Sequence, residues 1–183
     1  MARLIIWNLM SLDGYFEGPN HDLSFHEDVW GPELQELSLE QLRAAGALLF
    51  GRLTYRLMAD YWPTAEGEIG EIADFMNSLP KVVVSRTLKK SDWGNTRIVG
   101  ENAAEQVAKL KRDTEKDIYV FGSANLSATL IAAKLFDEFR IGLAPRLLGG
   151  GTPLFKPGER RKLRLIEASP HANGLVRLRY APV

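Results

Sequence analysis

The chain of 183 residues contains no cysteine. Disulfides, thiolate nucleophiles, iron–sulfur clusters and cysteine-based zinc sites are therefore all excluded. A surplus of charge is missing as well, because 23 basic residues balance 23 acidic ones. A protein whose main partner is nucleic acid needs a clustered positive surplus, so we do not expect that class of function.

Long apolar runs are also absent, and no stretch of the sequence is long enough to cross a bilayer. The apolar beginning of the chain, residues 4–7, is interrupted by Asn8, and no signal cleavage site follows it before Asp13. We therefore expect a buried first strand, a cytoplasmic protein and no membrane partner. With 45% hydrophobic residues, residues 1–183 are expected to form one domain with a sizeable core.

Several sequence signatures of chemistry are missing too. The P-loop pattern does not occur, which excludes a P-loop nucleotide site. The Gly-x-Gly-x-x-Gly fingerprint does not occur either, which disfavours a standard Rossmann site. A Gly-x-Ser-x-Gly elbow is absent, so a serine hydrolase is not supported. The three histidines, His21, His26 and His171, lack metal-ligand spacing, and we expect no metal.

Strand and helix patterns alternate through most of the chain. Strand patterns occupy residues 4–10, 47–50, 81–85, 96–99, 117–121 and 139–143. Helix patterns occupy residues 38–45, 52–59, 66–77, 102–114 and 124–134. The first of these helices is predicted from Ser38-x-x-Gln41, which resembles a capping box, and Gly46 is expected to end it.

The end of the chain has a different pattern. Asn173-Gly174 separates two runs, 162–168 and 175–180, and this dipeptide favours a β-hairpin. The sequence thus predicts an α/β fold in three layers. A mostly parallel central sheet would carry helices on both faces, with a C-terminal antiparallel hairpin.

Two turns from a strand into a helix have the same design. One strand ends at Gly51, and Arg52 and Thr54 open the helix that follows; the other turn reads Gly122-Ser123-Ala124-Asn125-Leu126. The start of a helix offers unpaired N–H groups and the positive end of the helix dipole, which together bind phosphate. Each turn could equally be a tight connection, but two of them suggest a ligand with several phosphates, such as a dinucleotide.

Three further segments are candidates for a binding site. Ser85 and Arg86 follow a strand and suit a phosphomonoester, such as the 2′-phosphate of NADPH, although a solvated turn is the simpler interpretation. Gly149-Gly150-Gly151 lets backbone approach a ligand or serves as a connector. Asp13 opens a long loop, residues 11–32, and could position a substrate, donate a proton or form an Asx turn. Other carboxylates could serve instead: Asp22, Glu27, Asp28 and Glu33.

Taken in order, seven segments resemble the dihydrofolate reductase-like superfamily. They are most similar to the reductase domain of the bifunctional riboflavin-biosynthesis deaminase–reductase and its stand-alone relatives. The segments are 11–14, 18–22, 50–55, 82–86, 119–123, Asp137-Glu138 with Pro145, and 149–155. The resemblance implies a largely parallel sheet with a C-terminal antiparallel strand pair. It also implies NADPH as the cofactor and hydride transfer to a C=N or carbonyl-derived carbon.

The resemblance further implies which residues act. It places Asp13 near the substrate, and Ser85 and Arg86 at the 2′-phosphate of the cofactor. We expect Asp13 to be the catalytic residue that supplies or relays the proton. It assigns the remaining cofactor contacts to Gly51, Arg52, Thr54, Gly122, Ser123, Asn125, Leu126, Gly149 and Gly150. One departure is that Gly122-Ser123 stands where a Gly-Gly pair is usual. Another is that the Thr-Val-x-x-Asp-Asp-Pro stretch of the riboflavin enzymes is absent.

From these observations we expect an NADPH-dependent reductase of a pterin-like or ribosylaminopyrimidine substrate. The resemblance is greatest to 5-amino-6-(5-phosphoribosylamino)uracil reductase. A dihydrofolate-type reductase and a non-catalytic NADPH- or nucleotide-binding module are the alternatives. Relatives often form dimers, so a homodimer is expected, and the apolar strand 139–143 could provide its edge.

Overall fold

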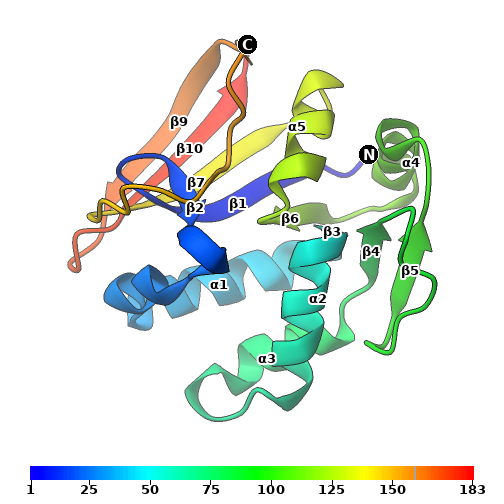
Figure 1. The fold of residues 1–183 in the computed structure, drawn as a ribbon, viewed down its shortest axis with the longest axis horizontal. Helices are drawn as coiled ribbons and strands as arrows, with labels where there is room; N and C mark the ends of the chain where they lie inside the picture. The colour runs from blue at the N-terminus through cyan, green and yellow to red at the C-terminus, as the bar shows by residue number, and fades with distance from the viewer. Residues whose placement is uncertain (159) are drawn as a thin grey trace.

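The structure is a computed structural model and describes residues 1–158 and 160–183. The described residues form an eight-stranded sheet in the order β5-β4-β3-β6-β1-β7-β10-β9 (Figure 1). Its strands are β1 (Leu4–Ser11), β3 (Ala45–Gly51), β4 (Lys81–Val84), β5 (Thr96–Val99), β6 (Asp117–Phe121), β7 (Glu138–Ala144), β9 (Leu163–Pro170) and β10 (Val176–Pro182).

Neighbouring strands from β5 to β7 are parallel, whereas β10 pairs antiparallel with both β7 and β9. A second, two-stranded sheet joins β2 (Tyr15–Glu17) to β8 (Thr152–Pro153). The predicted mostly parallel sheet with a C-terminal hairpin is confirmed.

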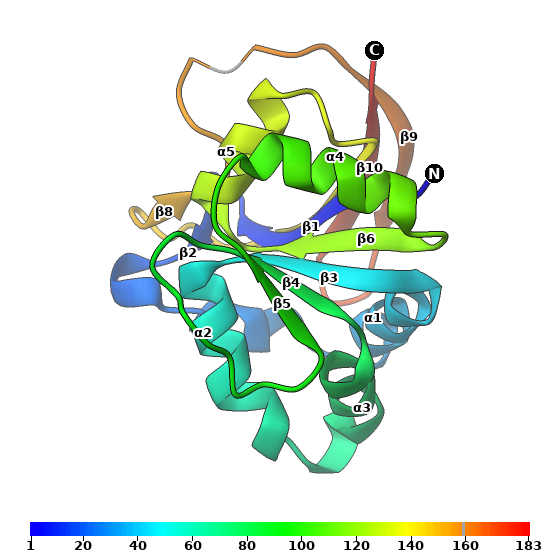
Figure 2. The ribbon, with the colours of Figure 1, turned by 90° about the vertical axis from the view of Figure 1, so that its right-hand side faces the viewer.

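Helices cover both faces of the sheet (Figure 2). On one face lie α1 (Pro32–Ala44), α2 (Arg52–Tyr61) and α3 (Gly70–Ser78). On the other lie α4 (Ala103–Asp113) and α5 (Ala124–Ala132). Each face has its own cluster of buried apolar side chains, and β1 is buried along its whole length because it lies between them. Short 3-10 helices occupy Pro19–His21, Ser24–Val29, Trp62–Thr64 and Gly67–Ile69.

The helix predicted over residues 38–45 begins six residues earlier, at Pro32. Proline suits the first turn of a helix, because the N–H groups of that turn have no acceptor within the helix and proline lacks an N–H. Ser38 therefore lies inside α1, and its hydroxyl donates to the Leu34 carbonyl at 2.8 Å. Gly46 lies within β3, where a Cβ would come within 2.9 Å of the Thr114 and Lys116 side chains. The predicted capping box and glycine stop were wrong.

The strand predicted over 139–143 is not an edge, because β7 lies between β1 and β10. The C-terminal hairpin extends the sheet past it, so that β5 and β9 are the outermost strands. A homodimer stays a prediction, and it would need a surface other than β7. Among the described residues, no helix has both the length and the hydrophobicity that crossing a membrane requires.

Candidate functional site

The two strand-to-helix turns lie side by side. Because β3 and β6 are adjacent and parallel, they end at the same end of the sheet, which we call the carboxyl end. The Gly51 N–H donates to the Ser123 hydroxyl at 2.9 Å, and the Ser123 N–H donates to the Thr54 hydroxyl at 3.0 Å. Two segments 72 residues apart are thereby joined into one unit.

Ser123 adopts the left-handed conformation that normally favours glycine, with φ +61°. Its hydroxyl holds it there, because it accepts from Gly51 and donates to the Phe121 carbonyl at 2.9 Å. Gly122 has φ +53°, and a Cβ on it would lie 3.0 Å from the Thr54 hydroxyl oxygen. The second glycine of the usual pair is thus replaced by a serine that fastens the turn.

These bonds decide which donors remain for a ligand. The N–H groups of Gly51, Gly122 and Ser123 all donate hydrogen bonds within the protein. The acceptor for the Gly122 N–H is the side-chain oxygen of Asn8, at 2.7 Å. No side chain among the described residues caps the start of α2 or α5. The free N–H groups of these two first turns therefore form a paired surface that suits anions.

The side chains around this surface differ in availability. Arg52 is half-buried and Asn125 is exposed, its amide oxygen accepting from Lys156 Nζ at 2.7 Å. Leu126 is buried in the core and offers only its backbone. Ser85 is also buried, and its hydroxyl accepts from the N–H groups of Leu88 at 2.9 Å and Thr87 at 3.2 Å. Ser85 thus shapes the turn after β4, whereas Arg86 is exposed and free to meet a ligand.

Asp13 fastens the glycine-rich segment to the end of β1. Its carboxylate accepts from the N–H groups of Leu148 at 3.1 Å and Gly149 at 2.8 Å. Hydrogen bonding by the Ser11 side chain and by these two N–H groups lowers the pKa of Asp13. The carboxylate is therefore ionised at neutral pH, and the contact joins the loops that follow β1 and β7.

The glycines of this segment have unequal surroundings. A Cβ on Gly149 or Gly150 would meet no described atom within 4 Å, so this backbone faces open space. A Cβ on Gly151, which has φ +135°, would lie 2.0 Å from the Glu17 carbonyl oxygen. Gly151 is therefore required for the pairing of β2 with β8. Gly149 and Gly150 leave room beside the backbone for a flat ring.

The long loop, residues 11–32, is folded against the body of the protein. Phe25 and Val29 are buried in the cluster under α1, and Asp28 forms an ion pair with Arg146 at 3.4 Å. Burial lowers the pKa of His26 to about 4, so this side chain is neutral at pH 7. The pairing of β2 with β8 was not predicted, because it joins short strands that are distant in the sequence.

A set of exposed apolar side chains was also missed. Large apolar side chains are exposed on the loops after β1 and β7 and along α2, which begins at the carboxyl end. The set comprises Leu12, Leu23, Trp30, Leu53, Leu57, Tyr61 and Leu147. The spacing of the three members on α2, at four-residue intervals, was the available signal.

This arrangement fits a dinucleotide cofactor. Two adjacent uncapped helix starts suit a pyrophosphate, an exposed arginine on the next strand suits a further phosphate, and open glycine backbone suits a ring. These elements all stand at the carboxyl end of parallel strands, where α/β sheets bind ligands.

Comparison with known proteins identifies the family of the chain. Residues 2–177 match the model of the RibD C-terminal domain. The uncharacterised protein YyaP of Bacillus subtilis (strain 168) is 31% identical over 181 residues, which cover 97% of this chain and 94% of YyaP.

Solved structures show the same fold. A protein of Shewanella sp. PV-4, provisionally named a riboflavin biosynthesis protein, has a TM-score of 0.83 at 22% identity, with 100% of this chain and 99% of that chain covered. The diaminohydroxyphosphoribosylaminopyrimidine deaminase/5-amino-6-(5-phosphoribosylamino)uracil reductase of Thermotoga maritima has a TM-score of 0.73 at 13% identity, with 100% and 57% covered. Dihydrofolate reductase from Enterococcus faecalis, complexed with NADP(H), has a TM-score of 0.66 at 11% identity, with 98% and 96% covered. The resemblance found in the sequence is thereby confirmed, and the chain belongs to the RibD C-terminal domain family.

Proposed function

We propose that the protein is an NADPH-dependent reductase of a nitrogen heterocycle, either pterin-like or a ribosylaminopyrimidine. The observation that carries this proposal is the pair of uncapped helix starts, joined through Ser123 and followed on the next strand by the exposed Arg86. Family membership supports an oxidoreductase of the riboflavin-pathway or dihydrofolate reductase-like kind.

In this proposal each part of the carboxyl end has one task. The first turns of α2 and α5, with Arg52 and Asn125, hold the pyrophosphate, and Arg86 pairs with the 2′-phosphate. Gly51, Thr54, Gly122, Ser123 and Ser85 shape the turns that present these groups, and Leu126 contributes backbone. Gly149 and Gly150 would lie beside the nicotinamide, which would supply the hydride when the cofactor is bound.

Asp13 holds the glycine-rich segment at the reacting end. The acceptor carbon of a C=N bond gains the hydride, and its nitrogen gains a proton. An ionised Asp13 has no proton to give, so water is the source consistent with its lowered pKa. A part for Asp13 in relaying that proton stays a prediction.

Substitution of Arg86 tests the cofactor assignment. We expect Arg86→Ala to weaken NADPH binding about tenfold or more, because a bidentate arginine–phosphate contact is lost. NADH lacks the 2′-phosphate, so its affinity should stay within about twofold. Titration of nicotinamide fluorescence measures both, with Lys90→Ala as the control, since Lys90 is an exposed cation of the same segment.

Two results would contradict the proposal. An equal loss for NADPH and NADH would overturn the 2′-phosphate role of Arg86. An unsubstituted protein that binds no NADPH would remove the reductase function altogether.

The alternative is a non-catalytic NADPH-binding module, in which Asp13 only holds the glycine-rich segment through the N–H groups of Leu148 and Gly149. This function predicts selective NADPH binding without oxidation of the cofactor by any heterocycle. Turnover of one acceptor would exclude it.

A further inference from the structure

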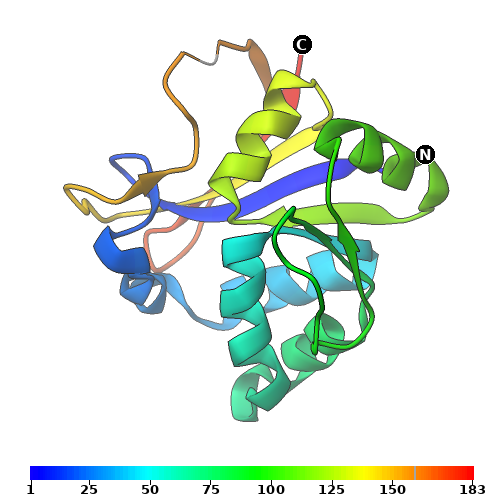
Figure 3. The same ribbon diagram turned by 45° about the vertical axis from the view of Figure 1, so that its right-hand side comes forward.

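The end of the sheet opposite the proposed cofactor site carries a group of arginine side chains. We call it the amino end, because the parallel strands begin there. Arg3 precedes β1, Arg140 lies near the start of β7, and Arg177 and Arg179 lie on β10, which pairs antiparallel with β7. Arg140 Nη1 donates to the Gln41 side chain of α1 at 3.3 Å. Figure 3 shows α1 on the opposite side of the sheet from α4 and α5, so the group lies under α1.

These side chains surround a small pocket, which we call the arginine pocket. Its volume is about 220 Å³. This is below the range of about 300–1,000 Å³ that is typical of sites for larger organic ligands, so a small ion fits it better. Its wall has four arginines but two carboxylates: Arg3, Arg140, Arg177 and Arg179, with Glu40, Asp117, Ala44 and Tyr119 completing the lining.

The wall of the arginine pocket holds hydrogen-bond donors that the protein does not use. A guanidinium group offers five N–H donors. Among the described residues, Arg177 makes one hydrogen bond, from Nη2 to Glu167, and its buried Nε has no acceptor. Arg179 makes two, to Glu138 at 2.6 Å and to Glu167 at 2.9 Å. A ligand that can only accept hydrogen bonds would satisfy the remaining donors.

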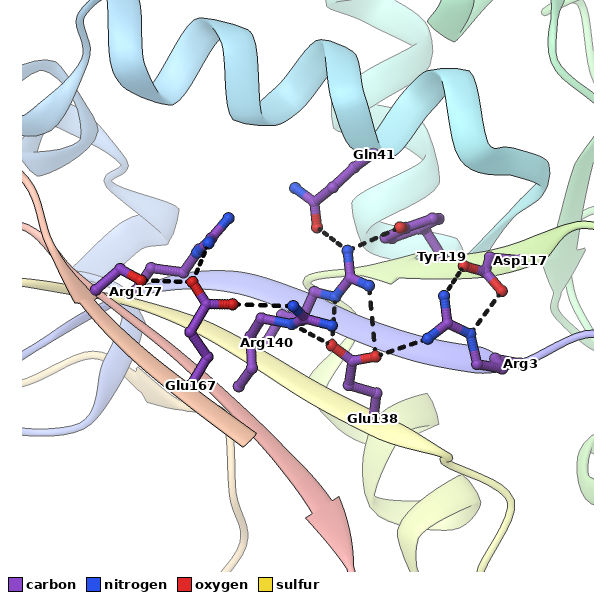
Figure 4. Close-up of polar contacts among 10 residues, drawn as sticks. Arg3, Gln41, Asp117, Tyr119, Glu138, Arg140, Glu167 and Arg177 are labelled. Carbon is purple, nitrogen blue, oxygen red and sulfur yellow. Dashed lines mark hydrogen bonds and ion pairs between the residues drawn. The ribbon is translucent and has the colours of Figure 1, made fainter. Parts of the chain in front are cut away.

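The arginines are held in place and their charge is not fully balanced. Arg140 and Arg177 are largely buried, with 11% and 20% of their side chains exposed. The ion pairs join four guanidinium groups to three carboxylates, those of Asp117, Glu138 and Glu167. One positive charge is therefore in excess within this network (Figure 4). Side chains that are already ordered bind an anion without a further entropic cost.

The titration of Glu138 is consistent with a positive potential here. Burial raises the pKa of its carboxyl group, but hydrogen bonds from Arg140 and Arg179 outweigh this effect and lower the pKa. Negative charge is therefore stabilised at this place even though the carboxylate is buried.

We propose that the arginine pocket binds a small oxyanion of the phosphate type. Its oxygens accept from the unused N–H groups of Arg177 and Arg179, in the geometry with which guanidinium groups hold phosphate. The site does not rest on the proposed function, because it lies at the other end of the sheet and shares no residue with the proposed cofactor site.

Titration with inorganic phosphate tests the proposal. Binding to the purified protein is measured by calorimetry near neutral pH, with sodium chloride keeping the ionic strength constant so that general screening does not contribute. We expect saturable binding, which Arg177→Gln weakens about tenfold or more because charge-assisted hydrogen bonds are lost. Arg43→Gln is the control, since Arg43 on α1 is paired with the exposed carboxylates of Glu36 and Glu71 instead. Its effect should stay within about twofold.

A carboxylate on the wall offers a gain of affinity. Glu40 is exposed and, among the described residues, forms no ion pair, so its charge opposes an anion in the pocket. Glu40→Gln should strengthen phosphate binding about threefold. Glu36→Gln, one turn earlier on α1, should leave it unchanged. Because Glu40 is exposed, this variant tests the proposal even if Arg177→Gln does not fold.

The helix starts at the carboxyl end could also take phosphate, and the variants separate the two places. Binding that Arg86→Ala removes and Arg177→Gln retains would overturn the proposal. So would the absence of saturable binding to the unsubstituted protein, or equal effects of Glu40→Gln and Glu36→Gln. NADPH affinity should be the same in Arg177→Gln and in the unsubstituted protein. Failure of NADPH to bind either protein would remove the proposed function and leave the arginine pocket standing.

Discussion

The two ends of the sheet use their charged groups in opposite ways. At the amino end, where the parallel strands begin, side chains are bonded to one another in a network (Figure 4). Glu138 lies at its centre with 3% of its side chain exposed. It accepts from Arg140 Nε at 2.7 Å, from Arg179 Nε at 2.6 Å and from Arg3 Nη1 at 3.2 Å.

The network extends outward from Glu138. Arg140 reaches the Tyr119 hydroxyl at 2.9 Å, and Arg3 pairs with both oxygens of Asp117. Hydrogen bonds from Ser169, Arg177 and Arg179 lower the pKa of Glu167 to about 2. At the carboxyl end, by contrast, no side chain among the described residues caps the start of α2 or α5, and Arg86 is exposed. The charged side chains of the amino end are thus paired with one another, whereas the helix starts and Arg86 at the carboxyl end have the openness that the proposed function requires.

Removing the centre of the network should have the largest effect. Glu138→Leu should lower the free energy of unfolding by about 3–5 kcal/mol, because it removes the buried carboxylate on which Arg140, Arg179 and Arg3 converge. Urea denaturation measures this. Glu36→Leu is the control, since Glu36 pairs with Arg43 on the surface and should cost less than about 1 kcal/mol.

The same variant tests the division between the two ends. NADPH affinity of folded Glu138→Leu protein should be unchanged, because the network lies at the opposite end from the helix starts. A loss of affinity as large as that of Arg86→Ala would show that the two ends are coupled.

A methyl group in the glycine-rich segment should have a smaller effect, confined to the carboxyl end. Gly151→Ala should lower the free energy of unfolding by about 1–3 kcal/mol, because φ +135° and the Glu17 carbonyl both oppose a side chain. Gly150→Ala, one residue earlier, should change it by less than about 0.5 kcal/mol, since its Cβ would point into open space. Equal losses would mean that the pairing of β2 with β8 does not depend on Gly151.

The sequence predicted the strands well because apolar runs of four or more residues are strong local signals. It also placed both strand-to-helix turns, which meet because parallel strands end together. The start of α1 was missed, since Pro32 competed with the apparent cap at Ser38. The network around Glu138 could not be predicted, because Arg3 and Glu138 are 135 residues apart. The hydroxyls of Ser85 and Ser123 looked like phosphate ligands, but backbone N–H groups already occupy both. For Ser85 these belong to the local turn, Thr87 and Leu88, whereas for Ser123 the donor is Gly51, 72 residues away, which only the tertiary structure shows.

The smallest effect on the fold is expected from Asp13→Asn, which keeps the size and one acceptor oxygen of the side chain. Two N–H groups, of Leu148 and Gly149, share the carboxylate, so the glycine-rich segment should loosen without unfolding. Hydrogen exchange of these two amides should accelerate about threefold to tenfold. The NADPH affinity should change less than about threefold, whereas turnover should fall about tenfold through a misplaced reacting ring.

A matched variant separates this effect from charge alone. Asp22→Asn removes a carboxylate of the same loop that accepts from the Ser24 N–H at 2.9 Å and that, among the described residues, forms no hydrogen bond with the glycine-rich segment. It should leave exchange at Leu148 and Gly149 unchanged. If the two variants slow turnover equally, the loop acts through its total charge; if Asp13→Asn leaves turnover unchanged, the reacting end is held by other groups. Faster exchange at Leu148 and Gly149 together with slower turnover in Asp13→Asn would place the proposed chemistry at the glycine-rich segment. These two results occur together only if the carboxylate positions the backbone of that segment rather than supplying a proton.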